Sequence, residues 1–247
     1  MSQHPLSVQL YTVREALAAD PAAALERVAQ LGFTTVELFR MQEMVDIYAE
    51  HLPRLGLTPS SAHASLVGKD VIPALDAARR LGITTLIEPF VPAEIWTDSD
   101  AVVGVANDLN ATAKIAADLG ITVGYHNHWW ELVDLDGATA LEALADNLDP
   151  AVILEVDTYW AQVGGVDAVR LLERLGDRVR FIHVKDGDIS TENKAQVAVG
   201  SGRMPVAEVL AAAPQAVRVV ELDDFAGDVF DALADSITFL RSHGESL

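Results

Sequence analysis

A short phrase that joins the end of a helix to a strand recurs along this chain, and it limits the possible folds more than any other feature. It reads QLGFTTVEL at 30–38, RLGLTPSSAH at 54–63, RLGITTLIEP at 80–89 and DLGITVGYHN at 118–127, with a weaker copy, RLGDRVRFIHV, at 174–184. In each full copy a leucine closes an apolar helical face, a glycine supplies the left-handed residue that ends the helix, and a run suited to a strand follows. The phrase therefore predicts a series of strand-helix units.

The apolar pattern predicts eight strands, near residues 7–11, 34–39, 58–63, 83–89, 121–126, 151–157, 179–184 and 217–222. Ala/Leu-rich helical segments separate them, such as DPAAALERVAQL, where Asp20 is placed to cap a helix and Pro21 to begin it. Strand runs such as AVILEVD are continuously apolar, as in a parallel sheet covered on both faces. We therefore expect an α/β fold, a single (β/α)₈ TIM barrel over residues 1–247. An open doubly wound sheet is the alternative, but its glycine-rich fingerprint is absent after the first strand.

Composition excludes several classes of function. Thirty-seven acidic residues against 17 basic residues give a net charge of −20, which argues against a nucleic-acid partner. The absence of cysteine excludes disulfides, cysteine-zinc sites and thiolate catalysis. The segment MSQHPLSVQLYTV does not read as a signal peptide, and no apolar stretch reaches the roughly 18 residues of a membrane span. We expect a cytoplasmic protein with a small-molecule partner and no membrane partner; the Ala-rich helices leave open whether it is a homo-oligomer.

Ionisable side chains end seven of the eight predicted strands, at the C-terminal ends where barrel enzymes place their chemistry. They are Glu37, His63, Glu88, His126, His128, Asp157, His183 and Glu221. Such groups are costly to bury among apolar residues unless they pair with one another or share a cation. Mixed imidazole and carboxylate ligands suit Mn²⁺, Zn²⁺, Co²⁺ or Fe²⁺ better than Ca²⁺. The three consecutive strands that end in Asp157, His183 and Glu221 therefore predict a divalent metal site.

Some of these residues have structural interpretations as well. Glu37 and Glu88 are candidate substrate contacts that could instead pair with an arginine or a lysine in the barrel mouth. A third candidate substrate contact is His63. The histidines in terminal or helical segments are expected at the solvated surface, namely His4, His51 and His243.

Five motifs near the strand ends carry a family resemblance. They are YHNHWWE at 125–131, EVDTYW at 155–160, HVKDG at 183–187, GSGRMPVAEVL at 200–210 and VVELD at 219–223. With these motifs the chain resembles the xylose isomerase-like barrel superfamily of sugar phosphate isomerases and epimerases, close to its inosose dehydratase-like members. The resemblance implies a TIM barrel with one divalent metal ion, Mn²⁺ first, with Zn²⁺, Co²⁺, Mg²⁺ or Fe²⁺ as alternatives.

The resemblance also implies a ligand set. In the sugar epimerases of the superfamily, two glutamates, an aspartate and a histidine from strands five to eight hold the metal. Asp157, His183 and Glu221 match three of these ligands, but the glutamate of strand five is missing. The alternatives for the fourth ligand are His126, His128 and Glu131.

The chemistry that this family implies is proton removal next to a metal-bound carbonyl of a keto sugar or keto-inositol. Glu221 is the first choice for the base, with His126 or His128 as its partner. Return of the proton to carbon gives isomerisation or epimerisation, whereas protonation of a departing hydroxyl gives dehydration of the inosose dehydratase type. A non-catalytic carbohydrate-binding barrel is a third hypothesis. A DNA-cleaving enzyme of the endonuclease IV type is disfavoured by the acidic charge.

Three further residues are candidates for contact with substrate. Lys185 could hold a substrate oxygen, or form an ion pair with a carboxylate such as Asp157, Asp186 or Glu221. Trp160 belongs to a group of aromatic residues after strands five and six that could stack on a sugar or pack against the barrel rim. Arg203, in the GSGR turn, could bind an anionic substituent.

Overall fold

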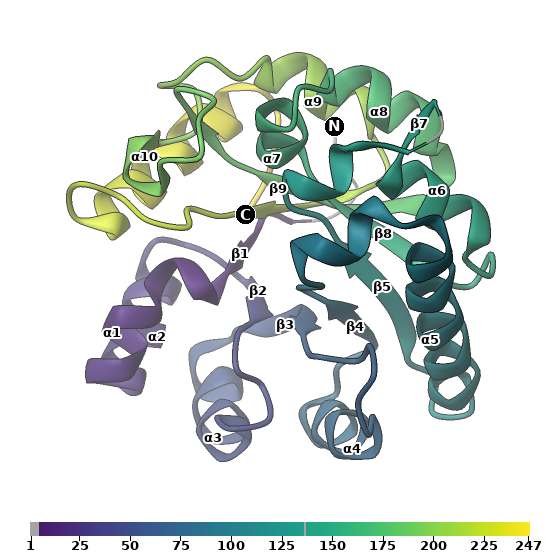
Figure 1. Ribbon diagram of the computed structural model, residues 1–247. Helices are drawn as coiled ribbons and strands as arrows, with labels where there is room; N and C mark the ends of the chain where they lie inside the picture. Colours follow the sequence, from purple (N-terminus) through teal and green to yellow (C-terminus); the bar gives the residue numbers. More distant parts are fainter. Residues whose placement is uncertain (1–4, 136) are drawn as a thin grey trace.

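Eight parallel strands close into a barrel in the computed structural model, which describes residues 5–135 and 137–247 (Figure 1). Their order around the barrel is β1-β12-β9-β8-β5-β4-β3-β2. The barrel strands are β1 (Ser7–Gln9), β2 (Thr35–Leu38), β3 (Thr58–His63), β4 (Thr85–Glu88), β5 (Thr122–His126), β8 (Ile153–Asp157), β9 (Val179–Val184) and β12 (Val217–Val220). Each lies inside a predicted strand range, so the predicted barrel is confirmed.

Helices surround the strands on the outside (Figure 1). They are α1 (Arg14–Ala19), α2 (Pro21–Gln30), α3 (Val45–Leu55), α4 (Ile72–Leu81), α5 (Ser99–Ala117), α6 (Ala140–Asn147), α7 (Thr158–Val163), α8 (Ala168–Leu175), α9 (Val206–Ala212) and α10 (Val229–Ser242). Short 3₁₀ turns occupy Leu10–Val13, Ala93–Thr97, Trp130–Leu132, Gly176–Arg178 and Asn193–Ala195. Two small antiparallel ribbons join β6 (Asp134–Leu135) to β7 (Ala138–Thr139) and β10 (Asp186–Gly187) to β11 (Gln196–Val197). No helix among these is long and apolar enough to span a bilayer.

The glycines of the recurring phrase end helices, as their chemistry predicts. Gly56 and Gly82 end α3 and α4 with φ of 70° and 69°, a conformation that glycine adopts without the strain of a side chain. At the other end of a helix, the Asp20 carboxylate accepts a hydrogen bond from the backbone N–H of Ala23, and Pro21 is the first residue of α2. These local signals set the order of strands and helices.

The barrel interior is apolar only over a thin layer. Ile87, Phe181 and Val219 form a small buried cluster inside the barrel, separate from the large core between the strands and the helices. Most of the buried polar residues of the strands lie nearer the C-terminal ends of the strands, including Gln9, Glu37, Glu88, Glu155, Asp157 and His183. The C-terminal part of the barrel is therefore filled with polar and charged groups, which must satisfy one another.

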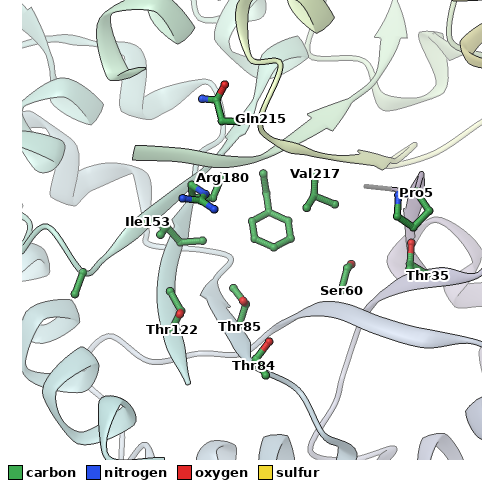
Figure 2. Close-up of a pocket in the computed structure, with 12 residues that line it drawn as sticks. Pro5, Thr35, Ser60, Thr84, Thr85, Thr122, Ile153, Arg180, Gln215 and Val217 are labelled. Atoms are coloured by element: carbon green, nitrogen blue, oxygen red, sulfur yellow. The ribbon is translucent and has the colours of Figure 1, made fainter. Parts of the chain in front are cut away.

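A separate cavity of about 530 Å³ opens at the opposite end of the barrel (Figure 2). Its lining includes the first residues of five strands, together with Arg180: Thr35, Thr85, Thr122, Ile153 and Val217. Because TIM-barrel chemistry takes place at the C-terminal ends of the strands, this cavity lies on the face associated with stability.

Two glycine substitutions test the local account of the fold. Gly82→Ala forces a left-handed alanine and should lower the free energy of unfolding by about 1–2 kcal/mol, whereas Gly104→Ala inside α5 should raise it by about 0.5–1 kcal/mol. A Cβ atom at either position would meet nothing within 4 Å, so backbone conformation alone separates the two variants. Urea unfolding measures both changes, provided that the dependence of the free energy on urea concentration (the m value) stays the same. Shifts of the same sign would contradict the assignment of Gly82 as a helix-ending residue.

Candidate active site

His183, in β9, is the residue on which the buried charges converge. Its Nδ1 lies 2.6 Å from Glu221 Oε2, and its Nε2 lies 2.8 Å from Glu37 Oε1 and 3.1 Å from Glu155 Oε2. The side chain is completely buried. Burial opposes its charge, but Glu155 and Glu221 outweigh that cost and hold the pKa of His183 well above its usual range. Its ring is therefore an imidazolium that donates to carboxylates on both sides.

One side of His183 faces a set that we call the upper group: Asp157, His183, Lys185, Glu221 and Asp223. The ammonium of Lys185 lies 2.8 Å from Asp157 Oδ2, 2.7 Å from Glu221 Oε2 and 2.7 Å from Asp223 Oδ2. Burial raises the pKa of Asp157, whereas Lys185 and His183 overcome burial and hold the pKa of Glu221 well below its usual range. Three carboxylates thus surround one ammonium.

The other side of His183 faces the lower group, which comprises Glu37, His63, His126 and Glu155. His63 Nε2 lies 2.7 Å from Glu155 Oε2 and 3.2 Å from Glu37 Oε1. Burial opposes the charge of His63, but Glu37 and Glu155 raise its pKa to about 10. Conversely, burial and the charge of Glu37 oppose ionisation of Glu155, yet His183 and His126 lower its pKa to about 2. Two carboxylates of the lower group are matched by the imidazoliums of His63 and His183.

The charges decide where a cation fits. Two sets of described residues place their ligand atoms within 4.8 Å of one another: Asp157, His183 and Glu221, or else His63, His126, Glu155 and His183. Glu37 and Glu155 are balanced by the imidazoliums of His63 and His183, whereas Asp157, Glu221 and Asp223 share the ammonium of Lys185 and the remaining contact with His183. Asp157 Oδ2 also lacks a well-aligned hydrogen bond within the described chain, despite its contact with Lys185. The donor set of the upper group therefore fits a divalent cation.

The three alternatives for a fourth ligand lie in different places. His126 is buried at the end of β5, with Nε2 at 4.0 Å from Asp157 Oδ2. His128 stacks on Trp130 with ring centroids 4.3 Å apart, and its backbone N–H donates to Glu131. The Glu131 carboxylate also accepts from the hydroxyl of Tyr125. The structure thus brings His126 next to Asp157, and the described contacts of His128 and Glu131 lie outside the upper group.

The described hydrogen bonds of Glu88 are with backbone groups and not with an arginine or a lysine. It ends β4, where its carboxylate accepts backbone N–H bonds from Leu66 at 2.6 Å, Val67 at 2.8 Å and Phe90 at 3.1 Å. Burial raises the pKa of Glu88. Its described hydrogen bonds fix the loops after β3 and β4, and they include neither an arginine nor a lysine.

Arg203 lies in an exposed loop rather than among the buried charges. Its guanidinium donates to the backbone oxygen of Asp188 at 3.3 Å. Asp186 holds that loop in place, because its carboxylate accepts backbone N–H bonds from Gly200, Gly202 and Met204. The described contacts of Arg203 therefore belong to the loop.

Trp160 lies beside the upper group and is 4% exposed. Its ring centroid is 5.5 Å from Lys185 Nζ, and its indole nitrogen has no hydrogen-bond partner in residues 5–135 and 137–247. Among the other histidines, His51 is half-buried in α3, His243 is exposed, and His4 lies outside the described residues. His243 therefore lies at the solvated surface as expected, and His51 is partly exposed.

A cavity of about 240 Å³ opens above the charged groups. Its lining includes His63, His126, His128, Glu221 and Asp223, with an aromatic rim. That rim is formed by Tyr11, Phe39 and Phe90. Carboxylates, imidazoles and aromatic faces thus meet in one cleft at the C-terminal end of the barrel.

Two of the residues in these groups were not singled out from the sequence. Glu155 lies inside the apolar run AVILEVD, and Asp223 follows β12 in VVELD. The signal for Glu155 was its spacing of two from Asp157, because residues i and i+2 of a strand point to the same face.

Comparison with known proteins agrees with this architecture. The chain belongs to the xylose isomerase-like TIM barrel family, whose model matches residues 25–242. It is 35% identical over 83 residues to an inosose dehydratase from Geobacillus kaustophilus, a match that covers 33% of this chain and 26% of that protein. An inosose dehydratase from Halalkalibacterium halodurans is 32% identical over 98 residues, or 39% of this chain and 31% of that one. These matches span less than a third of the length of the relatives.

Solved structures share the whole barrel. A sugar phosphate isomerase/epimerase from Parabacteroides distasonis superimposes with a TM-score of 0.83 at 23% identity, covering 96% of this chain and 93% of that one. The IolI protein, whose structure holds a zinc atom, gives a TM-score of 0.71 at 15% identity and covers 97% and 98% of the two chains. At these identities the likeness establishes the fold, and the predicted family membership is confirmed by the family model.

The raised pKa of His63 gives a prediction about stability. Between its ordinary pKa of 6.5 and its folded value of about 10, the folded protein holds a proton that the unfolded chain has released. Stability should therefore fall as pH rises through that range. As the pH rises through that range in the presence of EDTA, the thermal midpoint of the wild type should fall by several degrees more than that of His63→Gln. The conversion is roughly 2–4 °C for each kcal/mol of stability lost. The exposed His243→Gln should keep the wild-type slope, and an equally steep slope in His63→Gln would contradict the charge assignment.

Proposed function

We propose that this protein is a divalent-metal-dependent enzyme that removes a proton next to the carbonyl of a keto sugar or keto-inositol. The observation that carries the proposal is the upper group, with three carboxylates and one histidine nitrogen at the catalytic end of the barrel. The family membership and the names of the inosose dehydratase relatives support the same class of chemistry. The isomerase or epimerase reaction and the dehydratase reaction share this first step.

The residues that would hold the metal are Asp157, Glu221, His126 through Nε2, and His183 through Nδ1, which would give up its proton as the ion binds. When bound, a divalent ion would supply Lewis acidity that lowers the cost of removing a proton next to a carbonyl. Carboxylates and imidazoles suit Mn²⁺ and Zn²⁺ alike. The family resemblance favours Mn²⁺, and the zinc atom in the IolI structure supports Zn²⁺ as the alternative.

Glu221 and His128 form the proposed pair for proton transfer, because both line the same cavity and His126 would serve as a metal ligand. The pKa of Glu221 is held low, so its carboxylate is ionised at neutral pH and available to accept a proton. Burial and the charge of His183 hold the pKa of His126 well below its usual range, so its ring stays neutral, as a metal ligand requires. Lys185 orients Glu221 through a contact of 2.7 Å.

The cavity above the pair suits a polyhydroxylated ring. Its aromatic residues offer faces for apolar C–H groups, whereas His63, His128 and Asp223 offer polar groups for hydroxyls. Return of the proton to carbon would give an isomerase or epimerase. Delivery of a proton to a departing hydroxyl would give a dehydratase, and the inosose dehydratase relatives favour this second candidate.

Metal binding is the first test, with two helix-capping aspartates as a matched pair. Asp157 caps α7 and Asp167 caps α8, each through a backbone N–H, but only Asp157 belongs to the upper group. We expect about one equivalent of Mn²⁺, Zn²⁺ or Co²⁺ per chain in the wild type and in Asp167→Asn, and at least roughly tenfold weaker binding in Asp157→Asn. Elemental analysis and competition with a chelator measure both. A wild type that takes up none of the three ions would rule out the proposed function.

Turnover in D₂O tests the chemistry. With the metal found above, keto sugars and inososes should gain deuterium at the carbon next to the carbonyl, and mass spectrometry separates isomers from products that have lost water. Glu221→Gln should reduce kcat by roughly 10²–10⁴-fold, whereas Glu208→Gln on the exposed face of α9 should match the wild type. Exchange in Glu221→Gln at the wild-type rate would remove Glu221 from the role of base.

A further inference from the structure

The Glu155 carboxylate is surrounded by three histidines. Its Oε2 lies 2.7 Å from His63 Nε2, 3.1 Å from His126 Nδ1 and 3.1 Å from His183 Nε2. The side chain is completely buried, so water cannot replace any of these contacts. One oxygen atom therefore meets one nitrogen of each ring.

These contacts determine which ring nitrogens carry protons. An ionised carboxylate only accepts hydrogen bonds, so His183 Nε2, between Glu155 and Glu37, must be an N–H. Nδ1 of the same ring is the atom that faces Glu221. In His126, Nδ1 is on the side of Glu155, close to its carboxylate but not well aligned for a hydrogen bond, and Nε2 is on the side of Asp157. Both rings thus turn one nitrogen down to Glu155 and the other up to the upper group.

The geometry of β8 sets the positions of Glu155 and Asp157 relative to each other. Glu155 and Asp157 are two residues apart on β8 and share its inward face, so their carboxylates occupy successive levels of the barrel. The lower level is held on its far side as well, because Gln9 Nε2 donates to Glu37 at 2.7 Å and Ser61 Oγ donates to it at 2.5 Å. The imidazoles of His126 and His183 therefore lie between two levels of carboxylates.

We propose that Glu155 is a positioning residue for the metal site: it fixes the tautomer and the ring orientation of His126 and His183, so that Nε2 of the first and Nδ1 of the second are presented to Asp157 and Glu221. This inference rests on the proposed function, which places the metal in the upper group. A carboxylate on the far nitrogen of a metal-binding histidine orients the ring and increases its basicity. The set formed by His63, His126, Glu155 and His183 is then a support for the site and not the site itself.

Glu155→Gln tests the inference, because it keeps the shape of the side chain and removes its charge. Titration with Co²⁺ followed by visible absorption reports both affinity and ligand geometry. We expect Co²⁺ to bind 10–100-fold more weakly than to the wild type, with an altered absorption band. The matched control is Glu88→Gln, a buried glutamate at the same end of the barrel that accepts only backbone N–H bonds. It should bind Co²⁺ as the wild type does.

A second measurement needs no metal and no activity. Long-range ¹⁵N NMR of histidine-labelled, metal-free protein distinguishes the protonated ring nitrogens of His126 and His183. Glu155→Gln should change these signals, whereas Glu88→Gln should leave them as in the wild type. If Glu155→Gln does not fold, Glu155→Asp keeps the charge but withdraws it by one methylene, and the same two measurements apply to it.

The outcomes separate the inference from the proposed function. A wild type that binds no Co²⁺ overturns the proposed function, and the inference with it. Wild-type affinity, absorption and ring signals in Glu155→Gln overturn the inference alone. If Asp157→Asn keeps its Co²⁺ while Glu155→Gln loses it entirely, the metal belongs to the lower group and the positioning role is overturned. Weaker binding in both, with Glu88→Gln unchanged, supports the inference.

Discussion

An imidazole with a carboxylate at each of its two nitrogens is the interaction on which the charged interior of this barrel depends. His183 joins Glu221 on one side to Glu37 and Glu155 on the other, with no exposure to solvent. Without it, these three buried carboxylates would lack their common donor, and leaving such groups unpaired costs several kcal/mol. The apolar layer formed by Ile87, Phe181 and Val219 is too thin to fill the barrel on its own. Electrostatic pairing therefore takes over the role that branched apolar side chains play in other barrels.

Much of the fold could be predicted because its signals are local. A glycine such as Gly56 or Gly82 ends a helix by its own backbone conformation, and the strand follows within a few residues. The position of the site followed from the same reasoning, since the ends of parallel strands must meet at one end of a barrel. Asp157, His183 and Glu221 were found in this way, and their ligand atoms do converge.

The remaining features of the site depend on contacts across the barrel, which sequence spacing does not encode. Glu155 is isolated inside an apolar run, and its contacts with His63 and His183, which belong to other strands, cannot be seen in the sequence. The choice between His126 and His128 depends on where the chain leaves β5, because His126 ends the strand while His128 turns toward Trp130. Arg203 follows the path that Asp186 imposes on its loop.

In the upper group, Lys185 already occupies the position of a counter-ion that another cation could replace. Its ammonium is a tethered counter-ion, 2.8 Å from Asp157 and 2.7 Å from Glu221, so the two carboxylates that would hold a metal already have a cation of their own. Uptake of a metal ion at this place would therefore be an exchange of one cation for another. Asp223, which Gln196 also holds at 2.7 Å, is the carboxylate to which the displaced ammonium can remain bound. The protein can therefore fold with its carboxylates partly neutralised, and a metal ion bound there would replace the two ion pairs of Lys185 with Asp157 and Glu221.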